Sequence, residues 1–355
     1  MDWTHVRRRA SGLERIACEL FSPAALAPLS VRTQEAGHGR LSMAARQMLV
    51  LPAAAVTTPH SVWVFPGYPP SPLFSLLRER AIFYVHDLFL MTRARDLNSA
   101  ARAYMAKPFH FAVRHMRYFL ANSVTTAAAL SAHTAPDAVI TLYRPEVRDV
   151  FGLALSGERE PGDGTTLVIG CIGTIEPRKN FLAAARIRAT LSERLNRPVE
   201  LHIVGREGWG GDYCELSGMA HVRLHGFLAD DAAAAVIRRF DILLCSSEDE
   251  GLGLPLLEVQ HGGVAVVAPG GPVFHEVLGA SGTFIDPSQP DAAANTIMSL
   301  IGSSGWRARS AQLARANIAN WNARARDDRA RVIELMSELL RKVERKGVRG
   351  AECPS

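Results

Sequence analysis

The sequence predicts an α/β protein with two domains, each built on a parallel β-sheet. Short apolar runs alternate with helical patterns along the chain, which is typical of parallel α/β units. A length of 355 residues is long for one domain, and 48% hydrophobic with 21% charged residues allows two buried cores. A polar segment rich in Gly and Pro, residues 156–164, predicts a linker between the two halves.

The apolar runs place the expected strands. In the first half these are residues 48–51, 61–65, 81–85, 118–121 and 138–142. In the second half they are residues 167–172, 199–204, 221–224, 241–245, 264–268 and 283–285. The basic, Ala-rich tail has helical spacing from about residue 310 to 346. We therefore expect a first domain over 1–156, a second over 165–310, and a C-terminal helix and tail over 311–355.

The cysteine pattern and the N-terminus indicate a cytoplasmic protein. The five cysteines are scattered without metal-site spacing, and Cys171 and Cys245 lie in apolar runs where a thiol acts as a small hydrophobe. Residues 1–20 mix charged with apolar side chains, which is unlike a secretory signal. No apolar run reaches the roughly 18 residues that a membrane span needs.

Two carboxylates flank a Gly-rich turn that runs into a predicted helix. The stretch reads Glu250, Gly251, Leu252, Gly253, Leu254, Pro255, Leu256, Leu257 and Glu258. The glycines let the backbone approach a ligand, and Pro255 suits a first helical turn. The N–H groups of such a turn attract phosphate, while Glu258 can accept hydrogen bonds from sugar hydroxyls. The stretch therefore predicts a site for a phosphorylated sugar donor, with Glu250 at its mouth.

A second motif lies about 70 residues upstream, directly after the apolar run 167–172. It reads Gly173, Thr174, Ile175, Glu176, Pro177, Arg178, Lys179 and Asn180. Arg178 and Lys179 would stand at the carboxyl end of a buried strand, which is where open α/β sheets bind their ligands. A turn with two cations at this edge favours an anionic ligand.

Four motifs together resemble a known family. They are 173–180, 202–209, 225–227 followed by 229–231, and 250–258, which matches the Glu-x7-Glu signature of that family. In this order they are similar to the retaining, nucleotide-sugar-dependent glycosyltransferases of the GT-B fold, and in particular to family 4, the glycosyl transferases group 1. The resemblance covers residues 165–290 closely and the first half in patches. It implies two Rossmann-like domains with a donor cleft between them and a last helix that crosses back to the first domain.

The resemblance also implies roles for the motif residues. Glu258 would hold the ribose hydroxyls, and Glu250 would orient the donor sugar. Arg178 and Lys179, aided by the N–H groups of residues 251–254, would meet the charge that grows on the leaving diphosphate, without a metal ion. The family often has Arg where this chain has Thr174, next to Gly173, so more of the charge falls on the two cations. Gly205 with Arg206, and Gly226 with Phe227, would line the nucleobase pocket.

The first half carries two further family features. His86 and Asp87 follow the apolar run 81–85 and resemble a His-Asp pair of the family, which implies that His86 lies near the transferred sugar. In isolation, a His at a strand end is more often a structural hydrogen-bonder. The first strand looks truncated, because only residues 1–6 precede a basic segment, and Gly12 is the candidate for the usual loop near the donor.

A basic helical face is predicted within residues 105–120. Lys107, His110, Arg114 and Arg117 share one side of a helix, opposite an apolar side made of Met105, Phe109, Ala112, Val113, Met116 and Leu120. Such a face could dock on an anionic membrane or a lipid pyrophosphate, or it could simply be solvated. The formal net charge of +5 fits an anionic partner, and no nucleic-acid-binding module is visible.

The expected function is transfer of a hexose from a nucleotide diphosphate sugar to a saccharide or lipid-linked saccharide, with retained anomeric configuration, in cell-surface polysaccharide synthesis. Mannose from GDP-mannose is favoured, because the 173–180 motif resembles mannosyltransferases, and a UDP-sugar is the alternative. No cofactor is expected. Two other interpretations stay open, namely another GT-B sugar-nucleotide enzyme such as an epimerase or phosphorylase, and a non-catalytic or partner-dependent subunit.

Overall fold

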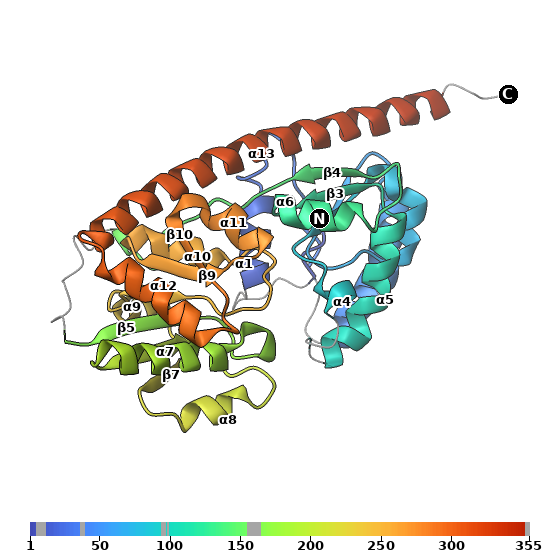
Figure 1. Cartoon of the computed structure of the whole chain (residues 1–355). Helices are drawn as coiled ribbons and strands as arrows, with labels where there is room; N and C mark the ends of the chain where they lie inside the picture. Colours follow the sequence, from blue (N-terminus) through green and yellow to red (C-terminus); the bar gives the residue numbers. More distant parts are fainter. Residues whose placement is uncertain (5–11, 36–39, 94–96, 98, 155–164, 352–355) are drawn as a thin grey trace. The chain divides into compact units, whose positions relative to one another are not determined.

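The computed structural model describes residues 1–4, 12–35, 40–93, 97, 99–154 and 165–351. The chain divides into two compact units (Figure 1). Unit 1 comprises residues 1–145 and 324–355, and unit 2 comprises residues 146–323. Each unit has its own parallel sheet, so the predicted fold class is confirmed. The chain passes from unit 1 to unit 2 between Pro145 and Glu146, ahead of the predicted linker, which lies outside the described residues.

The sheet of unit 1 has four strands, all parallel, in the order β1-β2-β3-β4. The strands are β1 (Trp63–Pro66), β2 (Ala81–Val85), β3 (Tyr118–Ala121) and β4 (Val139–Leu142). They match four of the five predicted strands of the first half. Their buried side chains pack with helical residues such as Phe74, Phe109 and Leu130 into one core.

The helical segments of unit 1 surround this sheet. They are α1 (Gly12–Phe21), α2 (Arg40–Ala45), η1 (Arg46–Val50), α3 (Leu51–Thr57), η2 (Pro72–Arg80), α4 (Phe89–Thr92), α5 (Ser99–His115) and α6 (Val124–Ser131). The strand predicted at 48–51 is wrong, because these residues are helical in η1 and at the start of α3. A four-residue apolar run does not distinguish a strand from a helix. The buried positions follow the spacing of a helix, because Leu51 and Ala55 are buried four residues apart while Leu49 is exposed.

The first residues run beside β1. The backbone N–H of Asp2 donates to the carbonyl of Val64 at 2.9 Å, and Asp2 forms an isolated parallel bridge with Gln34. Within the described residues, 1–4 therefore contribute one bridge rather than a full strand. Gly12 is the first residue of α1, and the segment 5–11 before it lies outside the described residues.

The sheet of unit 2 has six parallel strands in the order β10-β9-β8-β5-β6-β7. They are β5 (Leu167–Ile172), β6 (Val199–Val204), β7 (Val222–Gly226), β8 (Ile242–Leu244), β9 (Ala265–Pro269) and β10 (Gly282–Ile285). All six predicted strands of the second half are confirmed, with ends that differ by up to two residues. From β5 the chain builds outward through β6 and β7, then returns to the other side of β5 for β8, β9 and β10.

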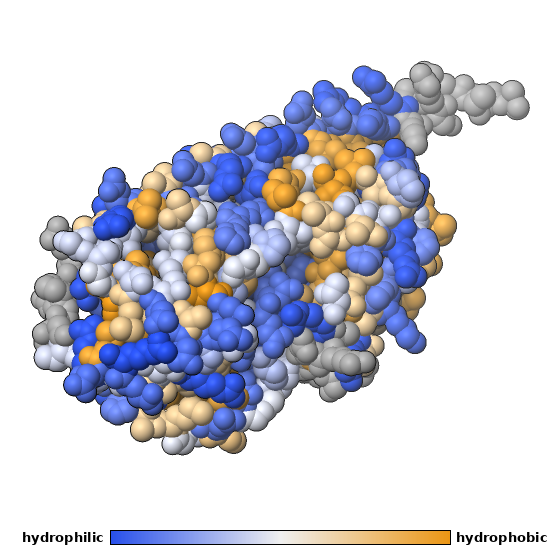
Figure 2. Space-filling view, viewed as in Figure 1, coloured by the Kyte–Doolittle hydropathy of each residue, from blue (hydrophilic) through white to orange (hydrophobic). Residues whose placement is uncertain are grey.

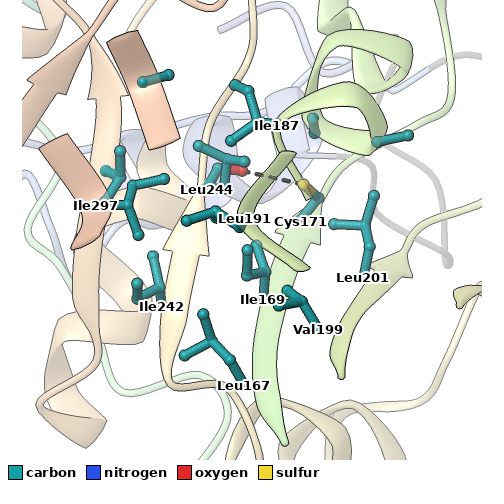
Figure 3. Close-up of a cluster of buried hydrophobic side chains, with 14 of the residues drawn as sticks. Leu167, Ile169, Cys171, Ile187, Leu191, Val199, Leu201, Ile242, Leu244 and Ile297 are labelled. Carbon is teal, nitrogen blue, oxygen red and sulfur yellow. Dashed lines mark hydrogen bonds between the residues drawn. The ribbon is translucent and has the colours of Figure 1, made fainter. Parts of the chain in front are cut away.

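The helices of unit 2 cover this sheet. They are η5 (Pro177–Lys179), α7 (Phe181–Leu195), α8 (Asp212–Ser217), α9 (Asp230–Ile237), α10 (Leu254–Glu258), η6 (Val259–Gly262), α11 (Pro272–Leu278), η7 (Gly279–Ser281) and α12 (Pro290–Gly302). Aliphatic side chains of β5, β6 and β8 meet those of α7 and α12 in one core (Figure 3). The Cys171 thiol lies inside it and donates to the carbonyl of Leu244 at 3.1 Å. Burial raises the pKa of this thiol far above its usual range, so Cys171 acts as a core residue.

The chain ends in one long helix, α13 (Trp306–Ala351), and the side of it visible in Figure 2 is mostly hydrophilic. Its residues up to Ala323 belong to unit 2, and the rest belong to unit 1. In unit 2, Asn322 accepts from the N–H of Val147 at 2.7 Å. In unit 1, the buried Asp328 accepts from the guanidinium of Arg144 at 2.7 Å. The predicted helical tail is therefore confirmed, and its last part packs with the first unit.

Candidate functional site

The strand order of unit 2 reverses between β5 and β8, which lie side by side. In open α/β sheets such a reversal leaves a crevice outside the carboxyl ends of the two strands, where ligands bind. The 173–180 motif follows β5, and the segment that leads into the 250–258 motif follows β8. The topology thus brings together two motifs that the sequence separates by about 70 residues.

Arg178 joins the two loops. One terminal nitrogen donates to Glu176 at 2.6 Å, and the other donates to the carbonyl of Asp249 at 2.6 Å and to Glu250 at 3.3 Å. The backbone adds a further bond, because the N–H of Glu248 donates to the carbonyl of Arg178 at 2.9 Å. Both ends of the guanidinium are therefore engaged in holding the loop after β8 against the loop after β5.

Lys179 points at the same carboxylate. Its ammonium lies 2.5 Å from Oε1 of Glu250, and the hydroxyl of Ser247 donates to that oxygen at 2.7 Å. The hydroxyl of Ser246 donates to the carbonyl of Lys179 at 2.9 Å, and this bond holds the Lys179 backbone in place. An ammonium carries three N–H donors, and the structure assigns one of them to Glu250. Lys179 thus has donor capacity for a ligand.

The charges of this group keep Glu250 ionised. Burial alone would raise the pKa of its carboxyl, but Lys179 and Arg178 outweigh burial and lower it. In Arg178 burial would lower the pKa, whereas Glu250 and Glu176 raise it. Two cations and two anions therefore form a cluster without net charge, and Glu250 can accept hydrogen bonds but cannot donate a proton near neutral pH.

Two glycines allow close backbone packing at this edge. A Cβ on Gly205 would lie 1.8 Å from the carbonyl oxygen of Gly173, and the N–H of Gly173 donates to Val204 at 3.0 Å. Gly173 itself has a φ of 142°, which L-residues rarely adopt, and its Cα faces the Lys179 side chain. The side chain of Thr174 packs toward Gly208. The loops after β5 and β6 therefore touch through their backbones.

The predicted Gly-rich turn also adopts its expected form. Gly253 has a φ of 74° and caps α10 at its N-terminus, with Pro255 in the first turn. Gly251 precedes this cap, and Leu252 and Leu254 are buried beside it. Glu258 is the last residue of α10 and is 4% exposed. The two glutamates thus sit at opposite ends of one turn-helix element.

Known proteins support the interpretation of this geometry. Residues 166–303 match the family described as glycosyl transferases group 1. The O-antigen chain mannosyltransferase B of Escherichia coli is 25% identical over 313 residues, which cover 81% of each chain. The serotype-specific mannosyltransferase WbdA of Escherichia coli is 29% identical over 134 residues, 36% of this chain and 16% of that protein.

Solved structures agree on the fold. WaaG, a glycosyltransferase involved in lipopolysaccharide biosynthesis, superimposes with a TM-score of 0.66 at 14% identity, over 92% of this chain and 96% of that chain. Anabaena Alr3699/HepE, solved in complex with UDP and glucose, gives a TM-score of 0.60 at 17% identity, over 86% of each chain. The chain has the GT-B fold, and its residues 166–303 are similar to the glycosyl transferases group 1.

In unit 1, His86 follows β2 at the carboxyl end of the sheet and is 8% exposed. Its ring packs edge-on against Tyr84, at 4.6 Å between centroids. The amide of Asn122, at the end of β3, donates to the His86 carbonyl at 2.8 Å. A Cβ on Gly67, whose φ is 121°, would lie 2.7 Å from the ring, so the Gly67 backbone leaves room for the imidazole.

The basic helix of unit 1 ends earlier than predicted. α5 stops at His115 because the chain turns into β3, so Arg117 lies outside it and pairs with Glu79 at 2.8 Å. Phe109 is buried on the apolar side as predicted, while Lys107 is exposed. Among the described residues, no helix is long and apolar enough to cross a membrane, and no cluster of His, Cys, Asp and Glu could hold a metal ion.

The prediction missed a chain of two histidines on β6 and β7. The ring of His225 lies 3.1 Å from Nδ1 of His202, whose Nε2 lies 2.9 Å from Glu200. Arg223 donates to the other oxygen of Glu200 at 2.9 Å. The signal was visible in the sequence, because alternate residues of a strand share a face and both strands place polar side chains two residues apart. Burial is the main cause that lowers the pKa of both histidines.

Proposed function

We propose that this glycosyltransferase moves a hexose, with mannose favoured, from a nucleotide diphosphate sugar to a saccharide or lipid-linked saccharide acceptor, with retention at the anomeric carbon. The observation that carries the proposal is the cluster of Lys179, Arg178 and Glu250 at the strand reversal of unit 2. It combines donors for a diphosphate with a carboxylate for sugar hydroxyls. No cofactor is part of the proposal.

The chemical problem is the negative charge that develops on the diphosphate as the bond to the sugar breaks. Lys179 is the group best placed to meet it, because its ammonium has N–H donors beyond the one used by Glu250. Arg178 acts mainly through position, since its contacts hold Glu250 and the loop of Asp249 in place. With these fixed cations the donor site would work without a metal ion.

Glu250 serves as a hydrogen-bond acceptor for the donor sugar. Its lowered pKa keeps it ionised, which suits orientation of hydroxyls and excludes a role as proton donor near neutral pH. Glu258 would hold the ribose hydroxyls, and Gly205 and Gly226 would pass close to the base. We assign His86 to a sugar hydroxyl bond, because its ring is held by Tyr84 and its backbone by Asn122.

The choice of mannose rests on the relatives. Both Escherichia coli proteins reported above are named as mannosyltransferases, and one is named for the O-antigen chain. GDP-mannose is therefore the first donor to test, and UDP-sugars are the second, because HepE was solved with UDP and glucose. Synthesis of a surface polysaccharide at the cytoplasmic side of the membrane is the corresponding biological setting.

Thermal unfolding with a panel of GDP-, UDP-, ADP- and dTDP-sugars in excess EDTA tests the proposal. A ligand at 100 times its dissociation constant stabilises the native state by about 2.7 kcal/mol. We expect one nucleotide class to raise the melting temperature, and we expect Lys179→Ala and Glu258→Ala to abolish this increase. Nuclear magnetic resonance of the product then reads the anomeric configuration. No shift with any nucleotide would contradict the donor site and favour a non-catalytic or partner-dependent subunit.

A further inference from the structure

Unit 2 contains a cavity that the donor motifs do not line. Its volume is about 440 Å³, and its walls come from the ends of β9 and β10 and from the first two turns of α12, which lie next to one another in Figure 1. The walls include Pro269, Phe284, Asp286, Pro287, Ala292 and Thr296. Small-molecule sites have volumes of about 300–1,000 Å³ and mainly apolar walls with a few polar groups. The size and lining of this β9–β10 cavity are therefore those of a ligand site.

The β9–β10 cavity lies at the same edge of the sheet as the cluster of Lys179 and Glu250. Pro269 ends β9 and Asp286 directly follows β10, so both belong to the carboxyl edge. In the sheet order, β9 is next to β8, and β10 is next to β9. Because neighbouring strands are about 4.8 Å apart, these two strands lie about 5–10 Å from β8. A ligand in the cavity would be near the donor cluster but would contact other residues.

Phe284 gives the cavity an aromatic wall. Its side chain is half-buried, and the ring of His275 in α11 lies against it at 3.9 Å between centroids. A Cβ on Gly282 would lie 2.9 Å from the Phe284 ring, so the backbone of this glycine leaves room for the ring. The face of an aromatic ring is negative and attracts the weakly positive C–H groups of a sugar. Phe284 can therefore pack against the less polar face of a hexose.

Two polar groups of the cavity accept hydrogen bonds. The hydroxyl and the N–H of Ser288 both donate to Oδ1 of Asp286, at 2.7 and 2.9 Å, and these bonds lower the pKa of the carboxyl. Asp286 is therefore ionised at neutral pH, and its Oδ2 can accept from a ligand. The hydroxyl of Thr296 donates to the carbonyl of Ala292 at 3.1 Å, which leaves lone pairs on its oxygen for a ligand.

The walls of the cavity carry no positive charge. Among the described residues that line it, none is Lys, Arg or His, and α12 contains no cation. Arg194 of α7 reaches α12, but it is paired with Asp291 and bonded to Asn295, which do not line the cavity. The charge of the lining is therefore that of Asp286. A phosphate would be repelled there, whereas a neutral ligand that donates hydroxyls would not.

We propose that the β9–β10 cavity binds a neutral hexose unit of a saccharide, separately from the donor cluster. The hexose packs on Phe284 and donates hydroxyls to Asp286 and Thr296. A nucleotide is the poorer occupant, because its phosphates would meet a carboxylate and no cation. The inference rests on the proposed function for the source of the hexose, which is a saccharide acceptor or product. A second contact of this kind would hold a saccharide chain near the donor site through a unit that does not react.

Ligand-observed nuclear magnetic resonance with the full chain and no nucleotide tests the proposal. The probes are two neutral hexosides, methyl α-mannoside and methyl α-glucoside, and inorganic phosphate is the anionic comparison. We expect at least one hexoside to bind with a dissociation constant of about 1 mM. Absence of binding for both hexosides at concentrations up to about 50 mM would overturn the proposal.

Three variants locate the bound hexoside. Phe284→Leu keeps an apolar side chain but removes the ring, and Asp286→Asn removes the charge, so each should weaken binding about tenfold. Ala292→Trp should abolish binding, because Ala292 is an exposed residue of the wall and the indole would fill the cavity. Since this position is exposed on a helix, Ala292→Trp keeps the test decisive if Phe284→Leu fails to fold. Circular dichroism and the melting temperature check the folding of each variant.

Each variant has a matched control outside the cavity. Phe111→Leu also removes a half-buried ring that stacks on a histidine, His115, at 4.1 Å. Asp327→Asn and Ala319→Trp change exposed positions of α13. All three controls should bind the hexoside as the parent does. Controls that lose binding as strongly as the test variants would overturn the assignment to the cavity.

Donor-site variants separate this inference from the proposed function. Lys179→Ala and Glu250→Gln should bind the hexoside as the parent does. Hexoside binding that Glu250→Gln removes and Ala292→Trp leaves intact would assign the hexose to the donor site and overturn the inference. Phosphate binding that Ala292→Trp removes would show an anion site and overturn it as well. Failure of every nucleotide sugar to bind, with hexoside binding intact, would contradict the proposed function alone.

Discussion

The ammonium of Lys179 lies 2.5 Å from a carboxylate oxygen of Glu250, although 71 residues separate them in the chain. The neighbouring parallel strands β5 and β8 bring the two residues together, because the loops that follow the two strands leave the sheet at the same edge. When no nucleotide sugar is bound, Lys179 and Glu250 neutralise each other's charge. On the proposed function, a diphosphate would bind to the N–H groups of Lys179 that Glu250 does not use, and this would tie the phosphate position to the sugar position.

Lys179→Ala should weaken donor binding and transfer while leaving the fold intact. The variant removes the ammonium that would meet the leaving diphosphate, and loss of one such contact lowers the rate about 100- to 1,000-fold. Calorimetric titration with the nucleotide sugar found in the thermal panel measures the binding, and product formation measures the rate. Arg186→Ala, an exposed position on α7, is the control. Unchanged kinetics in Lys179→Ala would refute the assignment.

Arg178→Lys should cost stability more than Lys179→Ala does. The guanidinium spans Glu176, Glu250 and the carbonyl of Asp249, and a lysine has one nitrogen that cannot reach all three. Breaking a buried pair of this kind costs about 3 kcal/mol. Urea unfolding of both variants gives the comparison. If Arg178→Lys unfolds at the parental urea concentration but loses transfer, Arg178 contacts the donor rather than bracing the loops.

Gly205→Ala should damage the donor site through the backbone. The added methyl would lie 1.8 Å from the carbonyl oxygen of Gly173, so one of the two loops must move. We expect a lower melting temperature, by an amount equivalent to about 2 kcal/mol, together with weaker nucleotide binding. The matched control is Gly211→Ala, where the new methyl meets nothing within 4 Å. Equal behaviour of the two variants would show that the loops are not coupled in this way.

The sequence predicted the second unit well because its signals are local. Each strand of that sheet is a short apolar run bounded by turn residues, and the six runs needed no knowledge of long-range contacts. The Gly-rich cap at Gly253 and the cation pair after β5 also follow from local chemistry. The ion pair between Lys179 and Glu250 was not predicted, since pairing depends on strand order, which the pattern of runs does not specify.

The first unit was harder to predict, for physical reasons. All four residues of the run 48–51 are apolar, but Leu51 alone among them is buried, and Ala55, one helical turn later, is buried as well. Helix α5 was extended too far, because the helical spacing of cations continued to Arg117, beyond the end of α5, and the apolar spacing continued to Leu120 in β3. The association of residues 324–351 with unit 1 came from resemblance, since the buried pair of Arg144 and Asp328 joins positions 184 residues apart.

Glu250→Gln should lower stability near neutral pH and lose this effect in acid. The folded protein lowers the pKa of this carboxyl, so its contribution is present above the ordinary value of about 4.3 and disappears as the pH falls through the folded value. At pH 7 we expect a loss of about 3 kcal/mol, because the variant leaves Lys179 without its counter-charge. Unfolding curves at a series of pH values measure the difference. Glu334→Gln, an exposed position on α13, should show no such pattern.

The two histidines of β6 and β7 predict a second loss of stability as the pH falls, at higher pH values than the loss caused by Glu250. Burial lowers the pKa of His202 and His225, and in His225 the neighbouring His202 adds to this. Between the folded values and the ordinary value of about 6.5, the unfolded chain binds more protons, so stability decreases as the pH falls through this window. His225→Asn should flatten this slope, measured by urea unfolding, whereas exposed His133→Asn should not. His225 Nε2 and His202 Nδ1 lie 3.1 Å apart, so the two rings titrate as a pair and removal of one should change the pH dependence of both. If His225→Asn leaves the slope of stability against pH unchanged, other groups are responsible for it.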